Sequence, residues 1–235
     1  MIEHDVLELN EENQLSIHMC LSCGCCEEWC PFDFSVSEIL MSEKERAVKK
    51  GVVYDEFEEI FENLEVHGLV HGEIEEEKEY PESGRVLYLR GCEFRENDPD
   101  VVDKTMDIFD KMGVNAFVLS DEDCCGIPAY HAGNTKLFKR LARNMTQKIN
   151  YSGADKVVTS CPSCAYAYRE LYPEYGQEID VDVKHVTEYL DIQKDSLDIK
   201  KKRGEFTVHE PCKLVNGLGN ANIMKRLMEP DIHVV

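Results

Sequence analysis

Three short apolar segments of the sequence are each followed, within a few residues, by cysteines. The segments span residues 86–89, 116–119 and 156–159, and patterns typical of helices separate them. Strands that alternate with helices form parallel sheets joined by right-handed crossovers, which predicts an α/β fold. Because the carboxyl ends of parallel strands lie along one edge of a sheet, where ligands bind, the cysteines should meet there. We therefore expect one metal site formed by Cys92, Cys124, Cys125, Cys161 and Cys164.

The cysteine content and the charge narrow the class of protein. Eleven cysteines in 235 residues, odd in number and mostly in close pairs, fit metal ligation in a reducing compartment better than a disulfide framework. The formal net charge of −21 argues against a nucleic-acid partner, because phosphate binding needs a basic surface. The first residues lack a secretory signal, and no apolar run approaches the roughly 20 residues that span a bilayer. We expect a cytoplasmic protein without a transmembrane segment, with any membrane association supplied by a partner.

A second cysteine motif lies near the start of the chain. Cys20, Cys23, Cys26 and Cys30, followed by Pro31, fit the ferredoxin run C-x2-C-x2-C-x3-C-P, which predicts a [4Fe–4S] cluster. A zinc knuckle is the competing interpretation. Zinc sites usually present two separated cysteine pairs, and a proline after a fourth cysteine is not part of their pattern. The spacing therefore favours iron–sulfur over zinc.

Two features of this motif stay open. Cys25 falls outside the spacing and is interpreted as a spare thiol beside the cluster. In two-cluster ferredoxins the fourth cysteine of such a run binds the other cluster, and here there is no second run. Either Cys30 closes the same cluster, or the fourth ligand comes from elsewhere, such as another subunit.

The periodicity of the apolar residues predicts two domains. A helical pattern over residues 37–64, interrupted at Gly51, indicates a small helical unit around the first cluster. A glutamate-rich stretch then breaks the pattern. We predict a helical ferredoxin-like domain over residues 1–72, an acidic linker over 73–84 and an α/β domain over 85–235.

Within the second domain we expect three helices and one further strand. The helices should span residues 98–113, 134–150 and 165–172, the first of them capped by the Asp98 carboxylate and the last ending before Pro173. The further strand is expected over residues 206–209. The basic run 200–203 is interpreted as a solvated turn before that strand.

Five thiolates at one site favour a multi-iron cluster. Thiolates select soft or borderline metals, so the alternatives are iron–sulfur and zinc, and four thiolates suffice for a zinc ion. The adjacent Cys124 and Cys125 are awkward ligands for one tetrahedral ion because neighbouring side chains diverge, but they can bridge or bind different irons of a larger cluster. Gly126 fits a place where the backbone turns sharply or approaches that cluster closely.

The cysteines and their neighbours closely resemble the cysteine-rich CCG domain family, over most of the chain. The segments that carry the resemblance are Arg90-Gly91-Cys92, Asp123-Cys124-Cys125-Gly126-Ile127-Pro128, Gly133-Asn134, Ser160-Cys161-Pro162-Ser163-Cys164 and His209-Glu210-Pro211-Cys212-Lys213-Leu214. Members include the B-type and D-type polypeptides of heterodisulfide reductase, the iron–sulfur polypeptide of thiol:fumarate reductase, and iron–sulfur polypeptides of glycolate, lactate and glycerol-3-phosphate oxidation. The N-terminal ferredoxin unit is similar to the D-type polypeptide of heterodisulfide reductase. The resemblance implies a Rossmann-like parallel sheet.

In the heterodisulfide reductase branch, the resemblance implies a non-cubane [4Fe–4S] cluster on the five cysteines. That cluster would cleave a disulfide such as coenzyme M–coenzyme B in two one-electron steps, fed by the ferredoxin-type cluster. The alternative is an electron-transfer subunit of a flavin-dependent dehydrogenase or of thiol:fumarate reductase. The implied partners are other redox subunits and a small-molecule disulfide or thiol. His131 and His209 are weak candidates for proton donors, since histidines near clusters often only orient ligands.

The chain departs from the family pattern in two places. Members with a fused ferredoxin unit normally carry two ferredoxin runs, and this chain carries one. A second copy of the CCG pattern should begin at Cys212, but only 23 residues follow it. We expect an oligomer, because half of a pseudo-symmetric domain would expose a large apolar face.

Overall fold

The computed structural model describes residues 10–32, 34–74, 78–194, 197, 205–228 and 233–234. The chain divides into two compact units. The described residues up to 74 together with 123–145 form the first, and residues 78–122 together with the described residues from 146 onward form the second. The predicted domain limits stay a prediction, and the basic run 200–203 lies outside the described residues.

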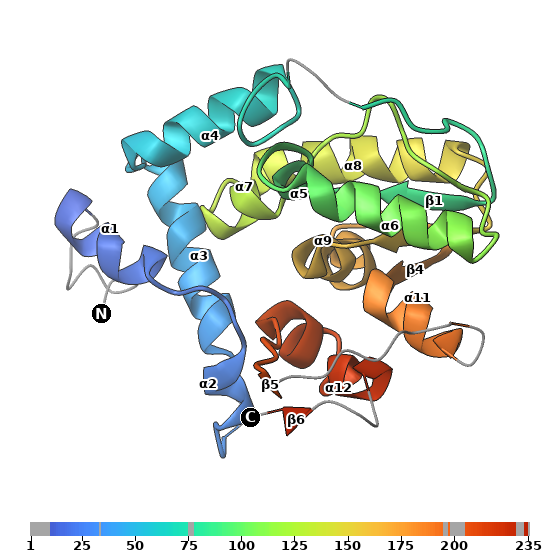
Figure 1. Ribbon diagram of the computed structural model, residues 1–235. Helices are drawn as coiled ribbons and strands as arrows, with labels where there is room; N and C mark the ends of the chain where they lie inside the picture. Colours follow the sequence, from blue (N-terminus) through green and yellow to red (C-terminus); the bar gives the residue numbers. More distant parts are fainter. Residues whose placement is uncertain are drawn as a thin grey trace. The chain divides into compact units, whose positions relative to one another are not determined.

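The first unit is helical, as the spacing of its apolar residues predicts. Its helices are α1 (Glu11–His18), α2 (Cys25–Glu28), α3 (Val36–Lys49), α4 (Asp55–Val66) and α7 (Ile127–His131), followed by the first turns of α8 (Thr135–Tyr151) (Figure 1). Helix α3 starts at Ser35, whose hydroxyl accepts the backbone N–H of Glu38. Ile17 of α1 and Ala47 of α3 are buried against each other in a small core.

The second unit is built on a four-stranded parallel sheet. Its strands are β1 (Val86–Leu89), β2 (Ala116–Phe117), β3 (Lys156–Thr159) and β4 (Asp182–His185), in the order β2-β1-β3-β4. Leu87 of β1 pairs with Phe117 and Val157 of its two neighbours. All four residues of β1 are buried, as is typical of a strand inside a parallel sheet covered on both faces. The α/β fold predicted from the sequence is confirmed.

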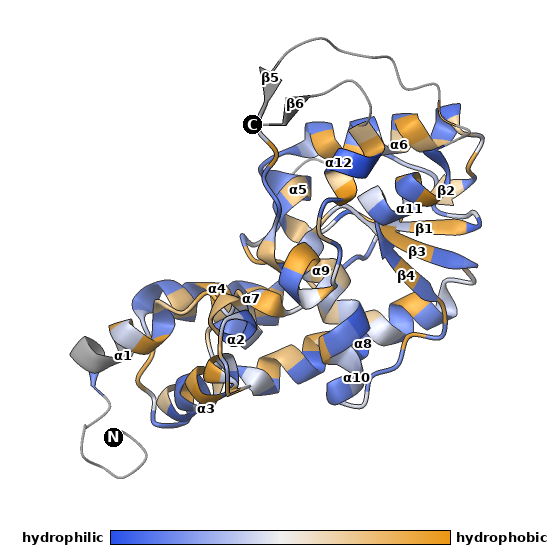
Figure 2. Cartoon of the chain, turned by 90° about the horizontal axis from the view of Figure 1, so that it is seen from below, coloured by the Kyte–Doolittle hydropathy of each residue, from blue (hydrophilic) through white to orange (hydrophobic). Residues whose placement is uncertain are grey.

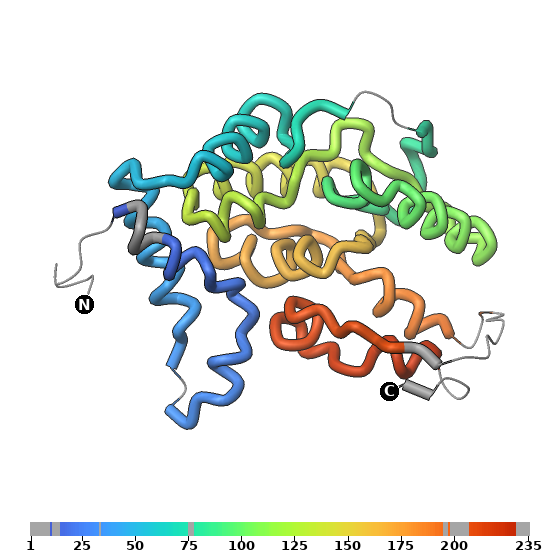
Figure 3. The backbone as a smooth tube through the Cα atoms, turned by 60° about the vertical axis from the view of Figure 1, so that its left-hand side comes forward, coloured from blue at the N-terminus to red at the C-terminus, as the bar shows by residue number. Residues whose placement is uncertain are grey.

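Helices cover this sheet through an aromatic core. Phe109 of α6 (Pro99–Lys111) packs edge-on against Tyr88 of β1 and against Tyr189 of α11 (Val186–Ile192), with both pairs of ring centroids 5.7 Å apart. Figure 2 shows β1 and β3 as apolar strands and β4 as a largely hydrophilic one. Helix α12 (Ile223–Met228) packs against α11 (Figure 3).

The structure differs from the predicted elements in several places. The strand predicted over residues 116–119 ends at Phe117. The Asp98 side chain makes no capping hydrogen bond to α6, so that prediction is wrong. The helix predicted to end before Pro173 instead continues through α9 (Pro162–Tyr166), the π-helical segment η1 (Ala167–Leu171) and α10 (Tyr172–Glu174). Pro173 is tolerated there because the wider π-helical turn already breaks the regular i to i−4 bonding.

The last difference concerns β4, the fourth strand of the parallel sheet. The apolar pattern did not predict a strand in this segment. The predicted strand over residues 206–209 is instead the short β5 (Glu205–Phe206), which pairs with β6 (His233–Val234) in a separate two-stranded sheet. A π-helical segment, η3 (Lys213–Gly217), precedes α12. In the described part of the chain, no helix combines the length and the hydropathy that a membrane span requires.

Candidate metal centres

The strand order of the second unit places a topological switch point between β1 and β3, the two strands that precede Cys92 and Cys161. From β1 the chain runs to β2, on one side of β1, and then to β3, on the other side of β1. Ligands of open α/β sheets bind at such a switch point, outside the carboxyl ends of the strands. Cys92 opens helix α5 (Cys92–Glu96) directly after β1, while Cys161 follows β3 and Cys164 lies in α9.

Gly91 brings the backbone of the first loop close to the second. Its φ of +79° and ψ of 143° belong to a region that residues with a Cβ rarely adopt. A Cβ at this position would lie 3.5 Å from Cys161 Cβ and 3.6 Å from Cys164 Sγ. The residue before Cys92 therefore contacts the loop that carries the other two thiols, and these three cysteines share one edge of the sheet.

A buried ion pair fixes the start of this loop. The Glu122 carboxylate accepts the backbone N–H of Arg90 at 3.1 Å, the N–H of Gly91 at 2.8 Å and Arg90 Nε at 3.2 Å. The two side chains are only 2% and 1% exposed. Arg90 Nη2 also donates to the Leu119 carbonyl at 2.7 Å, so the ends of β1 and β2 are tied together. Arg90 is among the residues that carry the family resemblance, whereas no local pattern marks Glu122.

A buried histidine holds the loop after β3. His185 is the last residue of β4. Its Nδ1 accepts the Thr187 N–H at 3.3 Å, and its Nε2 lies 2.9 Å from the Ser160 carbonyl oxygen. This bonding assigns the proton to Nε2, which donates to Ser160, the residue before Cys161. Burial lowers the pKa of His185 below its usual value of 6.5, so the ring is neutral at pH 7. Tyr88 bonds the Ser160 hydroxyl at 2.7 Å.

The same network reaches the segment after Cys212. Glu188 accepts the His185 N–H at 2.7 Å, Arg169 Nη1 at 2.9 Å and the Asn220 side-chain amide at 2.6 Å. These bonds connect β4, η1 and the C-terminal segment within the second unit. No sequence pattern signals them, because the strand that places His185 was not predicted.

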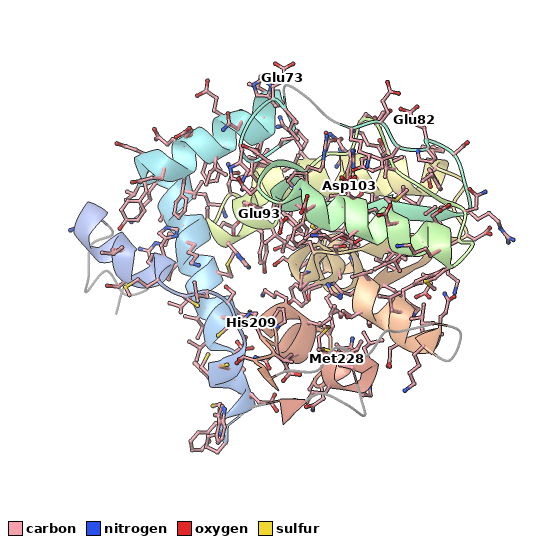
Figure 4. The ribbon with its side chains drawn as sticks, viewed as in Figure 1. Glu73, Glu82, Glu93, Asp103, His209 and Met228 are labelled. Atoms are coloured by element: carbon pink, nitrogen blue, oxygen red, sulfur yellow. The ribbon has the colours of Figure 1, made fainter. Side chains whose placement is uncertain are left out.

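The C-terminal segment also packs on α9, the helix that holds Cys164. Lys213 is buried, and its ammonium group lies 4.4 Å from the centre of the Tyr166 ring, in the range of cation–π contacts. His209, labelled in Figure 4, is exposed. Cys212, three residues later, is half-buried. The role considered for His209 as a proton donor stays a prediction.

Cys124 and Cys125 lie in the first unit, at the start of α7, and both are buried. The N–H of Cys124 donates to the Gly68 carbonyl at 2.7 Å, and the N–H of Gly126 lies 3.4 Å from Cys124 Sγ. Gly126 has a φ of +84°, and a Cβ there would lie 2.9 Å from the Phe138 ring. The tight turn expected at Gly126 is confirmed.

His131 also lies in the first unit, at the end of α7, with its ring centroid 6.0 Å from that of Tyr130. Its part in proton transfer stays a prediction. The grouping of Cys124 and Cys125 with Cys92, Cys161 and Cys164 likewise stays a prediction, and it enters the proposal below.

The four cysteines of the ferredoxin run lie on and around α2. Cys26 is in this short helix, and Cys20, Cys23 and Cys30 are half-buried in the chain before and after it. The N–H of Ser22 donates to Cys20 Sγ at 3.4 Å. Hydrogen bonds of this kind to ligand sulfurs are one of the means by which proteins tune iron–sulfur clusters.

Beneath this loop lies a buried cation. Lys44 of α3 is 1% exposed, and its ammonium group donates to the Cys20 carbonyl at 2.9 Å. Burial, with a smaller contribution from the charge of Lys44, lowers the pKa of His18 to about 4. His18 packs against the rings of Tyr54 and Phe57. The buried Lys44 ammonium group therefore holds the loop at Cys20, and the His18 imidazole just before the loop is neutral at pH 7.

The donor sets suit iron–sulfur ligation. All eleven cysteines lie in the described residues, and none forms a disulfide. Within the described ranges, no three His, Cys, Asp or Glu side chains lie together as a site for a single metal ion. An iron–sulfur cluster takes one thiolate per iron, so its ligands are spread over several metal atoms. The thiols along residues 20–30, where the Ser22 N–H is directed at Cys20 Sγ, and the thiols at the β1/β3 edge fit that requirement.

Comparison with known families agrees with this geometry. Residues 86–169, which contain β1, β3 and all five cysteines of the predicted site, match the cysteine-rich domain family CCG. The chain contains a CCG domain. No solved structure matches the chain significantly.

Several curated relatives of the chain are named as components of redox enzymes. The chain is 26% identical to the D-type polypeptide of dihydromethanophenazine:CoB–CoM heterodisulfide reductase of Methanosarcina barkeri, over 90% of this chain and 56% of the relative. It is 25% identical to the B-type polypeptide of fumarate reductase (CoM/CoB) of Methanothermobacter marburgensis, over 86% and 42%. It is 24% identical to the C-type polypeptide of anaerobic glycerol-3-phosphate dehydrogenase of Escherichia coli, over 54% and 35%. The chain spans about half the length of the first of these relatives.

Proposed function

We propose that this chain is an iron–sulfur subunit of an oxidoreductase that passes electrons to a disulfide. The observation that supports the proposal is that Cys92 and Cys161 follow the neighbouring parallel strands β1 and β3, with Gly91 beside Cys161 and Cys164, in a segment that matches the CCG family. Relatives named as components of heterodisulfide reductase and CoM/CoB fumarate reductase support a thiol or disulfide as the substrate.

In this proposal each cysteine set holds one cluster. Cys20, Cys23, Cys26 and Cys30 hold a ferredoxin-type [4Fe–4S] cluster, and the five-cysteine set holds a second, non-cubane [4Fe–4S] cluster. These clusters supply one-electron steps, and two electrons with two protons convert a disulfide such as coenzyme M–coenzyme B into two thiols.

The protein's own residues position the second site. Glu122 and Arg90 fix the backbone that enters Cys92, and His185 fixes the carbonyl before Cys161. The Arg90–Glu122 pair and His185 are buried, so they hold the backbone before the thiols without adding a charge to the protein surface. Other redox subunits deliver the electrons.

A second function is supported by a different observation. EtfAB:quinone oxidoreductase of Syntrophomonas wolfei is 26% identical over 82% of this chain, and a component of glycerol-3-phosphate dehydrogenase also matches. The chain would then only transfer electrons for a flavin-dependent dehydrogenase. The two functions differ in whether a disulfide reacts at the five-cysteine site.

Metal analysis and electron paramagnetic resonance of protein purified without oxygen test the proposal. We expect about eight irons, four for each cluster. Zinc in place of iron would contradict the redox assignment. Addition of the coenzyme M–coenzyme B disulfide to the oxidised protein should change the signal of the five-cysteine site. No response to any thiol or disulfide would favour the electron-transfer function.

The ligand assignment is tested with a matched pair of variants. Cys125→Ser should abolish the second signal and leave the ferredoxin signal, because it removes one thiolate of the five. Cys25→Ser, at a thiol outside the ferredoxin spacing, should leave both signals. An unchanged spectrum in Cys125→Ser would show that the five-cysteine set is wrong.

A further inference from the structure

Exposed apolar side chains gather around the N-terminal cysteines. Of the eleven large apolar side chains that are exposed in the described part of the chain, seven lie between Leu15 and Ile39. Trp29 is 85% exposed and Phe32 is 86% exposed. Five of the seven fall within residues 19–34: Met19, Leu21, Trp29, Phe32 and Phe34. Exposed patches of this kind mark interaction sites, and tryptophan is enriched among the residues that dominate binding energy.

The segment that carries this patch is anchored. The Glu27 carboxylate of α2 accepts the Ser35 hydroxyl at 3.1 Å and the Ser37 N–H at 2.9 Å, and it also accepts the Ser37 hydroxyl. These bonds tie α2 to the start of α3 across the segment that includes Phe32 and Phe34. An anchored segment loses less conformational entropy when a partner binds.

The charge around the patch selects the partner. Residues 15–43 contain five acidic residues and no lysine or arginine. The next residue, Lys44, is buried beneath Cys20 and offers no surface charge. In a chain with a net charge of −21, a second copy that presents this same acidic face, or an anionic lipid surface, would be repelled here. A basic protein is attracted.

We infer that residues 19–34 are the docking face of a basic electron-carrying protein, whose contact surface is an apolar patch surrounded by lysine and arginine. The inference rests on the proposed function, because it assigns a redox group to the N-terminal cysteines. In the complex, one electron moves between the partner and that group. One of the two is oxidised as the other is reduced, and no atom or proton is transferred.

Calorimetric titration with cytochrome c, a basic haem protein, tests the docking face directly. The variant is Trp29→Gln combined with Phe32→Gln, and the control is Tyr151→Gln, at an equally exposed aromatic residue at the end of α8. We expect the parent and the control to bind alike. The double variant should have a dissociation constant at least about tenfold higher, as for loss of an interface anchor. Binding should weaken as salt is added.

Two results would overturn the inference. One is equal binding of cytochrome c by the parent and the double variant, or no binding by either. The other is tighter binding of an acidic plant-type ferredoxin than of cytochrome c. Circular dichroism of both variants confirms that the fold is intact.

A kinetic arm separates this inference from the proposed function. Iron analysis is done first, and the reduced, loaded protein is then mixed with oxidised cytochrome c in a stopped-flow instrument. The second-order rate constant should fall at least about tenfold in the double variant. Protein without iron that still binds through Trp29 contradicts the proposed function and supports the docking face. Loaded protein with an unchanged rate constant contradicts the docking face alone.

Discussion

The buried pair of Arg90 and Glu122 predicts a large and asymmetric response to substitution. Glu122→Gln removes the charge but keeps an amide oxygen for the N–H groups of Arg90 and Gly91, which lie 3.1 Å and 2.8 Å from the carboxylate. The Arg90 guanidinium, 2% exposed, is then a buried charge without its carboxylate. Breaking a buried pair in this way costs about 3–5 kcal/mol. That is a large part of the roughly 5–15 kcal/mol that stabilises a typical domain.

The reverse substitution should cost less. In Arg90→Met the Glu122 carboxylate keeps two backbone N–H donors, which stabilise its charge. The double variant, Glu122→Gln with Arg90→Met, buries no charge, and replacing a buried pair with neutral groups is often nearly without cost. We therefore expect the double variant to be more stable than Glu122→Gln alone.

Urea unfolding of the reduced protein without metal measures this cycle. For a slope of about 1–3 kcal/mol per molar urea, the Glu122→Gln midpoint should fall by more than about 1 M. The second substitution should restore most of that loss. If the double variant is as unstable as the sum of the two single variants, the pair is not coupled and the reasoning is refuted.

Three further outcomes follow from single contacts. Gly133→Ala should lower the thermal unfolding midpoint more than Gly153→Ala does. Both glycines have a positive φ, but only at Gly133 would an added Cβ collide with the protein, 2.5 Å from the Lys44 carbonyl. Equal shifts of the unfolding midpoint in the two variants would exclude that collision. In the loaded protein, Lys44→Met should lower the reduction potential of the N-terminal cluster, because a buried positive charge favours the reduced state. Lys44→Arg keeps the charge and should preserve the potential. Redox titration followed by electron paramagnetic resonance measures both potentials, and equal values in the two variants would contradict the prediction. Burial lowers the pKa of His185 below 6.5, so as the pH falls the histidine takes up a proton in the unfolded chain before it does in the folded one, and stability is lost below about pH 6.5. His185→Asn should therefore reduce the pH dependence of the free energy of unfolding measured in urea. An unchanged pH dependence would assign the effect to other groups.

Local sequence pattern was sufficient for the parts of this protein that depend on near neighbours. The apolar runs at residues 86–89 and 156–159 form strands within those limits, and the stripe on α8 forms a helix. Because each strand is followed directly by its cysteines, the placement of Cys92 and Cys161 at one edge of a parallel sheet could be predicted. The turn at Gly126 also follows from local steric rules.

The supports of the candidate site could not be predicted in this way. Strand β4, Asp182–His185, has one buried aliphatic residue and lies at the edge of the sheet, so its sequence lacks the apolar run that marks β1. It forms because β3 offers it a row of backbone groups to pair with. Without β4, nothing in the sequence connects His185 with Ser160, 25 residues earlier.

The sequence by itself determined the α/β class, the strands β1 and β3 that precede Cys92 and Cys161, and the ferredoxin spacing at residues 20–30. The tertiary structure alone decided which strands are neighbours, and with them the switch point between β1 and β3, the Arg90–Glu122 pair and the histidine that holds the second loop. The reason is physical. Periodicity and turn chemistry act within a few residues, whereas a buried charge or a neutral imidazole is stable only where distant segments supply its partners.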